Sequence, residues 1–373
     1  MIKRLSCLIL SLLFVLLFAA CNGKGDTSTG ETSASTGETS ASTGESGSQS
    51  GEQSTDESGS QSGEQSTDES GSGKQEDTDN YMSIIKDKLF KGGFDISYMN
   101  ENAYVDYAGK ASGIRQWVIN EEGSFDQFNA TTPVEEENGF YVIKSPKNSK
   151  VFKVNTTTGQ VYMELNAEVD YGNTPRKAGQ SWPHILICQN YSEFETPYLD
   201  SAEEVRLSMD FDFVKFEDVM GKSADKGLHA CQFQWYVTIQ NTNKESPDYG
   251  DFFWFGLQFF DNRYTFCPKG LIVDQGKDTA TGKAIYTMDM KRVMKLKPVE
   301  QGESYSVDYD ILPEVKKALE AVKQMEDIDC FKNTNLSDLR IGHTNIGWEM
   351  PGTYNGAVMI NSFDIRVKNK KQL

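Results

Sequence analysis

Short runs in which apolar and polar residues alternate recur through the second half of the 373-residue sequence and begin shortly before it. Successive side chains of an extended chain point to opposite sides, so this alternation is typical of strands that bury one face. Gly, Asn, Asp and Pro bound the runs, as expected of turns. The pattern predicts strands over residues 140–143, 151–154, 160–165, 184–189, 205–214, 231–240, 252–260, 284–288, 305–309, 339–344 and 358–367.

Residues 311–325 break this alternation. Asp310 precedes the segment as a candidate N-cap, and Pro313 falls in the first turn, where proline is tolerated. Apolar residues recur every three or four positions, which is the spacing of one helical face. These positions, which predict one helix packed outside a sandwich, are Ile311, Leu312, Val315, Leu319, Val322 and Met325.

Many short strands, two of them long, favour a jelly roll over a small sandwich. We therefore expect an all-β fold over residues 81–373: a jelly-roll β-sandwich of two antiparallel sheets with one packed helix and an N-terminal elaboration. From Trp182 onward, the strand rhythm and the aromatic and amide content resemble the concanavalin A-like lectin and glucanase superfamily. The resemblance implies a curved antiparallel sheet that offers a concave face to sugars.

The first residues have the features of a secretory signal. Lys3 and Arg4 precede an apolar stretch that ends in small residues, and the stretch is too short to span a bilayer comfortably. The sequence up to Cys21 resembles the lipobox of bacterial lipoproteins, although Phe18 stands where that family usually has Leu. The resemblance implies a signal peptide over residues 1–20 and a lipid on Cys21. The alternative is an ordinary cleaved signal peptide.

Residues 21–80 have the composition of a disordered tether. Ser, Thr, Gly, Glu, Gln and Asp dominate, short polar repeats occur, and most of the formal net charge of −18 lies here. Such a segment buries too little apolar surface to offset the entropy of ordering. We expect an extracytoplasmic protein, lipid-anchored to the bacterial cell membrane or surface, whose domain is held clear of the membrane.

Two predicted strands have one apolar face and one polar face. Residues 231–240 place Gln232, Gln234 and Tyr236 opposite an apolar face, and amides and phenols suit sugar hydroxyls. Residues 205–214 place Asp210 and Asp212 opposite apolar side chains. We expect these polar residues to share one concave face. The apolar face of the first strand, expected in the core, consists of Cys231, Phe233, Trp235, Val237 and Ile239.

Indoles and charged turns complete the candidate site. An indole stacks on the C–H face of a sugar ring, so Trp182 and Trp254 are expected at the edge of the concave face, although a doubly buried strand also explains Trp254. Arg263 is expected to brace a turn with Asp261. The candidate glycan-binding residues are Gln232, Gln234, Tyr236, Asp210, Asp212, Trp254, Trp182, His184 and Arg263.

An enzyme of the same fold is the alternative function, with no catalytic residue assigned. A glycoside hydrolase needs two carboxylates about 5 to 10 Å apart, and Asp210 with Asp212, or either one with Glu349, supplies the residue types. The resembled glucanases carry Glu-x-Asp-x-x-Glu, whose last acid is missing here. A polysaccharide lyase needs a base and a group that neutralises a uronate. The Gln-x-His of lyases with this fold would start at Gln232, where Gln234 replaces the His.

Other chemistries lack a motif. There is no His-x-x-x-His or Cys-x-x-Cys pair for zinc, no phosphate-binding loop and no basic stripe for nucleic acid. We expect no cofactor; calcium, whose ligands need no sequence motif, is the alternative. Cysteines at positions 188, 231, 267 and 330 are expected as buried thiols, with disulfide pairing as the alternative.

The sequence thus predicts a membrane-anchored lipoprotein that recognises an extracellular polysaccharide through the concave face of a β-sandwich. A polysaccharide lyase or glycoside hydrolase of the same fold, and a structural surface protein without a small ligand, are the alternatives.

Overall fold

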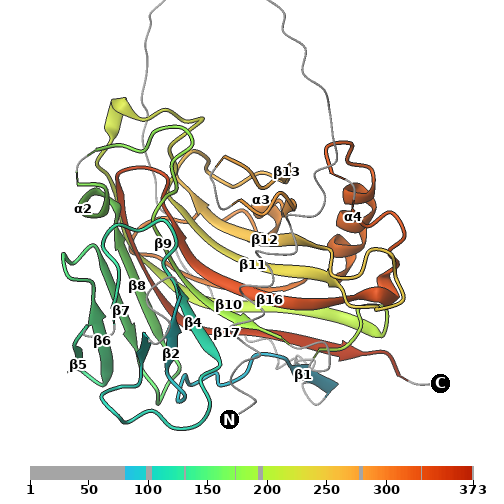
Figure 1. Cartoon of the computed structure of the whole chain (residues 1–373), viewed down its shortest axis with the longest axis horizontal. Coiled ribbons are helices and arrows are strands. Elements are labelled where there is room, and N and C mark those ends of the chain that lie inside the picture. The colour runs from blue at the N-terminus through green and yellow to red at the C-terminus, as the bar shows by residue number, and fades with distance from the viewer. Residues whose placement is uncertain are drawn as a thin grey trace, which may run out of the picture. The chain divides into compact units, whose positions relative to one another are not determined.

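Alternating apolar residues form two large sheets that pack face to face (Figure 1). The computed structural model describes residues 80–97, 103–129, 132–172, 174–191, 196–276, 280–328 and 330–371. The predicted jelly-roll sandwich is confirmed, with two exceptions to antiparallel pairing. In these exceptions β12 runs parallel to β14 and β2 runs parallel to β4.

One sheet, which we call sheet A, has long central strands paired over most of their length. Its order is β15 (Ser304–Asp310), β10 (Ala202–Asp218), β17 (Tyr354–Asn369), β8 (Val161–Asn166), β7 (Lys150–Val154), β6 (Phe140–Lys144) and β5 (Val134–Glu137), and β1 (Tyr81–Ser83) pairs with the end of β17.

The other sheet, which we call sheet B, has nine strands in the described part of the chain. Its order is β13 (Gly270–Val273), β14 (Ala284–Thr287), β12 (Phe252–Asp261), β11 (Gln232–Asn241), β16 (Leu339–Glu349), β9 (His184–Asn190), β4 (Trp117–Asn120), β2 (Phe94–Ile96) and β3 (Tyr104–Val105).

An aromatic core fills the space between the sheets. Phe211 of sheet A lies with its ring centroid 5.3 Å from that of Phe233 in sheet B, and Trp235 meets Phe363 edge-on at 6.0 Å. Phe211, Phe233 and Trp235 have no exposed surface. The predicted apolar face of residues 231–240 therefore does point into the core.

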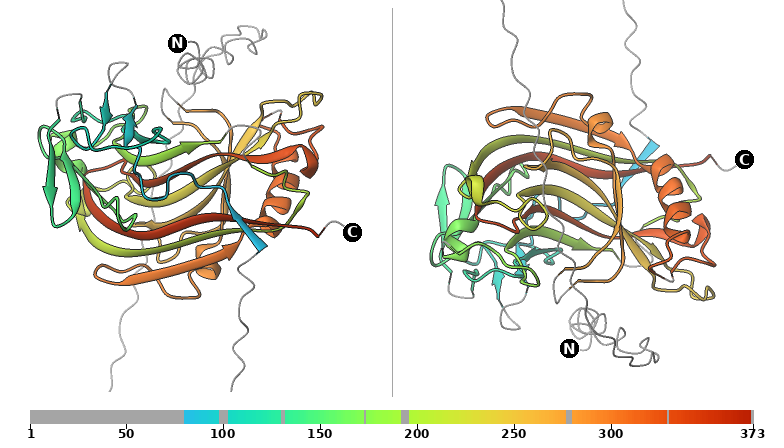
Figure 2. Two further views of the ribbon diagram at one scale, coloured as in Figure 1. Left: turned by 90° about the horizontal axis from the view of Figure 1, so that it is seen from below. Right: turned by 90° about the horizontal axis from the view of Figure 1, so that it is seen from above.

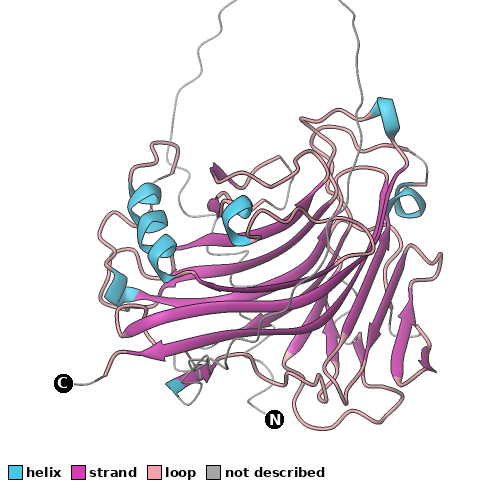
Figure 3. Ribbon diagram, turned by 180° about the vertical axis from the view of Figure 1, so that it is seen from behind, coloured by secondary structure: helices cyan, strands magenta, loops and turns pink. Residues whose placement is uncertain are grey.

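The predicted helix is α4 (Leu312–Lys323), with Pro313 in its first turn. Asp310 acts one position earlier than a standard N-cap, because its carboxylate accepts from the backbone N–H groups of Leu312 and Val205. Figure 3 shows α4 at one end of the sandwich. Short helical segments not predicted from the sequence are α2 (Ala167–Tyr171), α3 (Met290–Val293), and the 3₁₀ turns Gly221–Ser223 and Leu336–Asp338.

Both sheets bend in the same direction, and sheet B lies on the inner side of the bend (Figures 1 and 2). The side of sheet B that faces away from sheet A is therefore the inner side of the curve. We call this surface the inner face. Loops before β9, before β11 and after β12 meet at one end of it, as their mutual hydrogen bonds show.

All strands predicted from the sequence are present, with ends that differ by a few residues. The N-terminal elaboration adds β2, β3 and β4 to sheet B and β5 to β8 to sheet A. The signal peptide, Cys21 and the tether lie outside the described residues. No helix within the described ranges is both long and apolar enough to cross a membrane.

Candidate ligand-binding face

A row of four polar side chains crosses the inner face at one end. Strand pairing places Gln232 of β11 between Asp261 of β12 and Glu349 of β16, and Glu349 beside His184 of β9. Residues paired in register project from the same side of a sheet. Four strands that are far apart in the sequence thus contribute one residue each to the polar row.

Polar residues continue along the same face toward the other end of the strands. Gln234 lies next along β11, Tyr236 pairs with Asn345, and Thr238 pairs with His343. The Oδ1 atom of Asn345 is buried and has no hydrogen-bond partner among the described atoms. The centre of the face therefore contains amides from both β11 and β16.

Glu349 is surrounded by groups from the loop that precedes β9. The indole Nε1 of Trp182 donates to Glu349 Oε2 at 2.9 Å, and the imidazole Nε2 of His184 lies 3.4 Å from the same oxygen. The other ring nitrogen of His184 lies 2.6 Å from the backbone carbonyl of Glu122. Both ring nitrogens of His184 therefore face an oxygen atom, and these two contacts fix the orientation of the imidazole.

Arg176 stacks on Trp182, with its guanidinium carbon 4.6 Å from the ring centroid. The guanidinium donates to the carbonyl oxygens of Gln180, Leu228 and Gly276, and burial lowers the pKa of Arg176. These carbonyls belong to three different loops. Arg176 therefore ties the rim of the inner face together while it holds the indole in place.

Asp261 and Arg263 form the predicted turn brace. The side chain of Asp261 is fully buried, and its two oxygens accept from the Arg263 guanidinium at 2.8 and 2.6 Å. Gln232 and Gln258 donate to the same carboxylate at 3.0 and 2.8 Å. Because all of these donors converge on it, the carboxylate serves to hold the end of β12.

Tyr236 lies on the predicted face, but it is less open than expected. Its ring lies across Gly256 of β12, where an added Cβ would come within 2.0 Å of the ring. Its hydroxyl pairs with Thr287 of β14 at 2.9 Å, and only 7% of the residue is exposed. Burial raises the pKa of Tyr236, so its hydroxyl stays protonated. Tyr236 shapes the floor rather than presenting a free phenol.

Trp254 and His343 lie side by side further along the face. Trp254 is partly exposed, donates to Thr281 Oγ1 at 3.4 Å, and has its ring centroid 5.8 Å from that of His343 in an edge-on arrangement. The ring nitrogen Nδ1 of His343 contacts Asn190 Oδ1 at 2.7 Å. Burial lowers the pKa of His343 to about 4, so it is neutral at physiological pH.

The prediction that Asp210 and Asp212 join this face is wrong. Both residues lie on β10 of sheet A and point away from the core, on the opposite side of the sandwich. Asp212 accepts from Ser304 and Asn361, and Asp210 accepts from Ser362. Alternation correctly separated the polar from the apolar side of the strand. It carries no information about which sheet the strand joins.

Two exposed aromatic side chains beside the polar row were not among the candidate binding residues. Phe125, 66% exposed, lies in the loop that contacts His184 through Glu122, and Tyr264 follows Asp261. Gly123 packs against the backbone of Trp182, where a Cβ would come within 2.2 Å of the carbonyl oxygen. Turn residues followed by a single aromatic were the only sequence signal for these rim positions.

Cysteines 188, 231, 267 and 330 are buried free thiols, as expected. Within the described ranges no three His, Cys, Asp or Glu side chains are grouped so that they could hold a metal ion. The expected absence of a cofactor stays a prediction, with calcium as its alternative.

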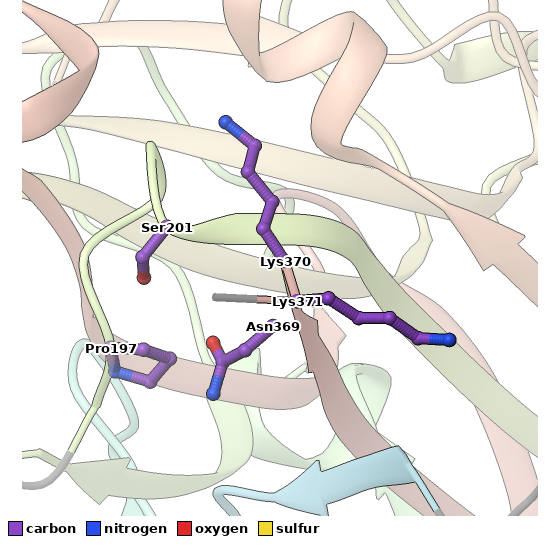
Figure 4. Close-up of a pocket in the computed structure, with 5 residues that line it drawn as sticks. All are labelled: Pro197, Ser201, Asn369, Lys370 and Lys371. Atoms are coloured by element: carbon purple, nitrogen blue, oxygen red, sulfur yellow. The ribbon is translucent and has the colours of Figure 1, made fainter. Parts of the chain in front are cut away.

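Figure 4 shows a small pocket at the C-terminal end of β17. It is lined by Pro197, Ser201, Asn369, Lys370 and Lys371. The two lysine side chains extend away from each other, and Lys370 donates to the carbonyl of Asp200 at 2.6 Å. No aromatic or acidic side chain lines this pocket. We assign it no function.

No family model and no curated protein matches the sequence. Among solved structures, the chain is similar to a family 12 xyloglucanase from Bacillus licheniformis, with 10% identity, 63% of this chain and 96% of that chain covered, and a TM-score of 0.37. An endoglucanase from Rhodothermus marinus has 9% identity and a TM-score of 0.33, with 64% of this chain and 97% of that chain covered. A family 11 xylanase from Neocallimastix patriciarum has 8% identity and a TM-score of 0.33, with 63% of this chain and 95% of that chain covered. Function has to be argued from the residues of this chain.

Proposed function

We propose that this chain is a lipid-anchored extracytoplasmic protein that recognises a polysaccharide on the inner face of sheet B. The observation that carries the binding proposal is the polar floor of β12, β11 and β16, with an indole near each end. Trp254 pairs with Thr238, whereas Trp182 contacts Glu349 beside Gln232. Six residues of strand span about 20 Å, so the two indoles suit a chain of sugars rather than one.

The chemistry of the floor also supports a sugar ligand. Amide side chains donate and accept in fixed planes, which matches the paired donor and acceptor character of hydroxyl groups. Asn345 of β16 adds an amide to this floor beside Tyr236 of β11.

Hydrolysis is the second candidate, because Asp261 and Glu349 lie on the same face on either side of Gln232. Two strand spacings separate their backbones by roughly 10 Å. Asp261, however, is fully buried and is held by Arg263, Gln232 and Gln258. Its oxygens are therefore poorly placed to act as a base or nucleophile, and binding is the better-supported function.

Replacing either indole should weaken polysaccharide binding. Trp182→Ala and Trp254→Ala should each cost about 1 to 3 kcal/mol of binding free energy through loss of a stacking surface. Glycan-array screening of the full chain, followed by calorimetry with the best ligand, measures this change. Asp210→Ala is the matched control, because Asp210 lies on the other sheet. Equal weakening by all three variants, or by none, contradicts the proposal.

The same experiment separates binding from cleavage. The wild-type chain should leave its polysaccharide ligand intact. New reducing ends would favour hydrolysis, and products that absorb as unsaturated uronates would favour a lyase.

The lipid anchor is tested independently at Cys21. Wild-type protein should partition with membranes, and its mature N-terminal peptide should carry acyl chains in mass spectrometry. Cys21→Ala should abolish acylation and release the protein. Indistinguishable partition of the two proteins would show that the anchor is absent.

A further inference from the structure

A second cluster of titratable groups lies under the loop that contacts His184, away from the inner face. Glu121 follows β4, Lys150 begins β7 and Asp170 belongs to α2. Glu121 and Lys150 have no exposed surface, and Asp170 is 4% exposed. The binding function uses none of these three groups directly.

Distances within the cluster are short. Lys150 Nζ lies 3.2 Å from Asp170 Oδ2 and 3.5 Å from Glu121 Oε2, and it donates to the backbone carbonyl of Asp126. The ring of Phe128 lies 6.0 Å from the same nitrogen. An amine and two carboxyl groups therefore meet in a buried site lined on one side by an aromatic ring.

Burying this many charges is costly. Taking an ammonium and two carboxylates out of water costs several kcal/mol for each ion, and the attraction between them repays the cost only in good geometry. An amide is neutral and loses this penalty. The site thus favours a reaction that converts an ion pair into an amide.

We propose that Lys150 and Asp170 become joined by an intramolecular amide bond, which the chain forms by itself with Glu121 as the proton-transfer group. Lys150 Nζ forms a bond to Asp170 Cγ, and the bond from Cγ to one carboxyl oxygen breaks. The two protons lost by nitrogen as the ammonium becomes an amide leave with that oxygen as water. No oxidant or other co-reactant takes part.

The neighbours of Asp170 suit this reaction. Oδ1 accepts from the backbone N–H of Phe125 at 2.7 Å, a contact that stabilises the tetrahedral intermediate and persists on the amide carbonyl. Oδ2 faces Lys150 and accepts from Ser149 Oγ at 3.1 Å, which marks it as the oxygen that leaves.

Glu121 is suited to moving the protons. Burial raises the pKa of Glu121 to about 7, even though the ammonium of Lys150 acts in the opposite direction. A carboxyl group with a pKa near neutrality both gives and takes protons efficiently. The backbone N–H of Phe128 holds both of its oxygens at 3.1 Å, which fixes its position beside Lys150.

The bond would fasten the rim of the inner face. Asp170 holds the loop of Phe125, and the carbonyl of Glu122 in that loop contacts His184. A link from β7 to α2 therefore fixes this loop without a disulfide. The inference does not depend on the ligand proposed for the inner face.

Peptide mapping of the denatured wild-type full chain tests the bond. Trypsin should not cleave after Lys150, and residues 148–153 should be found joined to residues 154–176, lighter than the sum of the two peptides by one water. Fragmentation should place the link at Lys150 and Asp170. Recovery of residues 148–150, 151–153 and 154–176 as three separate, unmodified peptides, or a link at another residue pair, overturns the proposal.

Two variants test the roles of the groups. Asp170→Asn should give a linked product with the same mass as the wild type, because ammonia leaves in place of water. Glu121→Gln should fold with its buried volume kept and show at least a hundredfold slower linkage. Linkage at the wild-type rate in Glu121→Gln would remove Glu121 from the reaction. The wild-type digest decides the bond itself even if a variant is insoluble.

Discussion

Replacing Trp235 with alanine should lower the free energy of unfolding by about 4 kcal/mol, which is what deleting a fully buried indole costs. Trp235 has no exposed surface and lies between the sheets against Phe363. Its Nε1 donates to Thr344 Oγ1 at 2.7 Å, so the variant also leaves a buried hydroxyl without its donor. Urea denaturation monitored by circular dichroism measures the change.

The neighbouring residue provides the control. Tyr236→Phe removes only the hydroxyl that pairs with Thr287, which should cost about 1 kcal/mol. Because Tyr236→Phe keeps its ring and loses one hydrogen bond, the comparison tests whether burial of the indole dominates the Trp235 loss. Similar losses in both variants would show that it does not.

Removing the carboxylate of Asp261 should lower the free energy of unfolding by about 3 to 4 kcal/mol. Asp261→Ala leaves the guanidinium of Arg263 without its counter-charge and two amides, from Gln232 and Gln258, without their acceptor. Thermal and urea denaturation of the purified full chain measure the loss.

Removing the cation should cost less. The side chain of Arg263 is 24% exposed, whereas that of Asp261 is fully buried. In Arg263→Ala, the amides of Gln232 and Gln258 still satisfy Asp261. The double variant should be little worse than Asp261→Ala alone, because the two residues act as one brace. Additive losses would show that Asp261 contributes through other contacts.

Strand alternation predicted the fold well, because burial of one face of each strand against the core determines the alternation within that strand. Each apolar position of residues 231–240 is in the core, and the register that sets Trp235 against Tyr236 follows from period two alone. The helix at 312–323 was equally predictable from its spacing.

The candidate site was only partly predictable, because it depends on which strands become neighbours. Trp182, His184 and Glu349 were separate sequence features, and only the pairing of β9 with β16 joins them. The same information was missing for Asp210 and Asp212, whose strand lies in sheet A.

Coverage by neighbouring segments was also invisible in the sequence. Tyr236 is covered because β14 adds to the edge of β12 and brings Thr287 to its hydroxyl. Glu121, Lys150 and Asp170 lie in separate segments of the sequence, and charged residues there are normally interpreted as solvent-exposed. Only the tertiary structure brings them together in a buried site.

The last strand of the sequence, β17, lies at the centre of sheet A between β10 and β8, and it also pairs with β1. Its antiparallel pairing with β10 extends from the pair Ala202 and Asn369 to the pair Asp218 and Tyr354. The centre of sheet A is therefore formed by residues far apart in the sequence. Such long-range pairing makes folding slow, and the centre of sheet A cannot form until β17 has been synthesised. A chain exported in the way we propose would therefore remain unfolded during translocation. It would fold only after it has crossed the membrane.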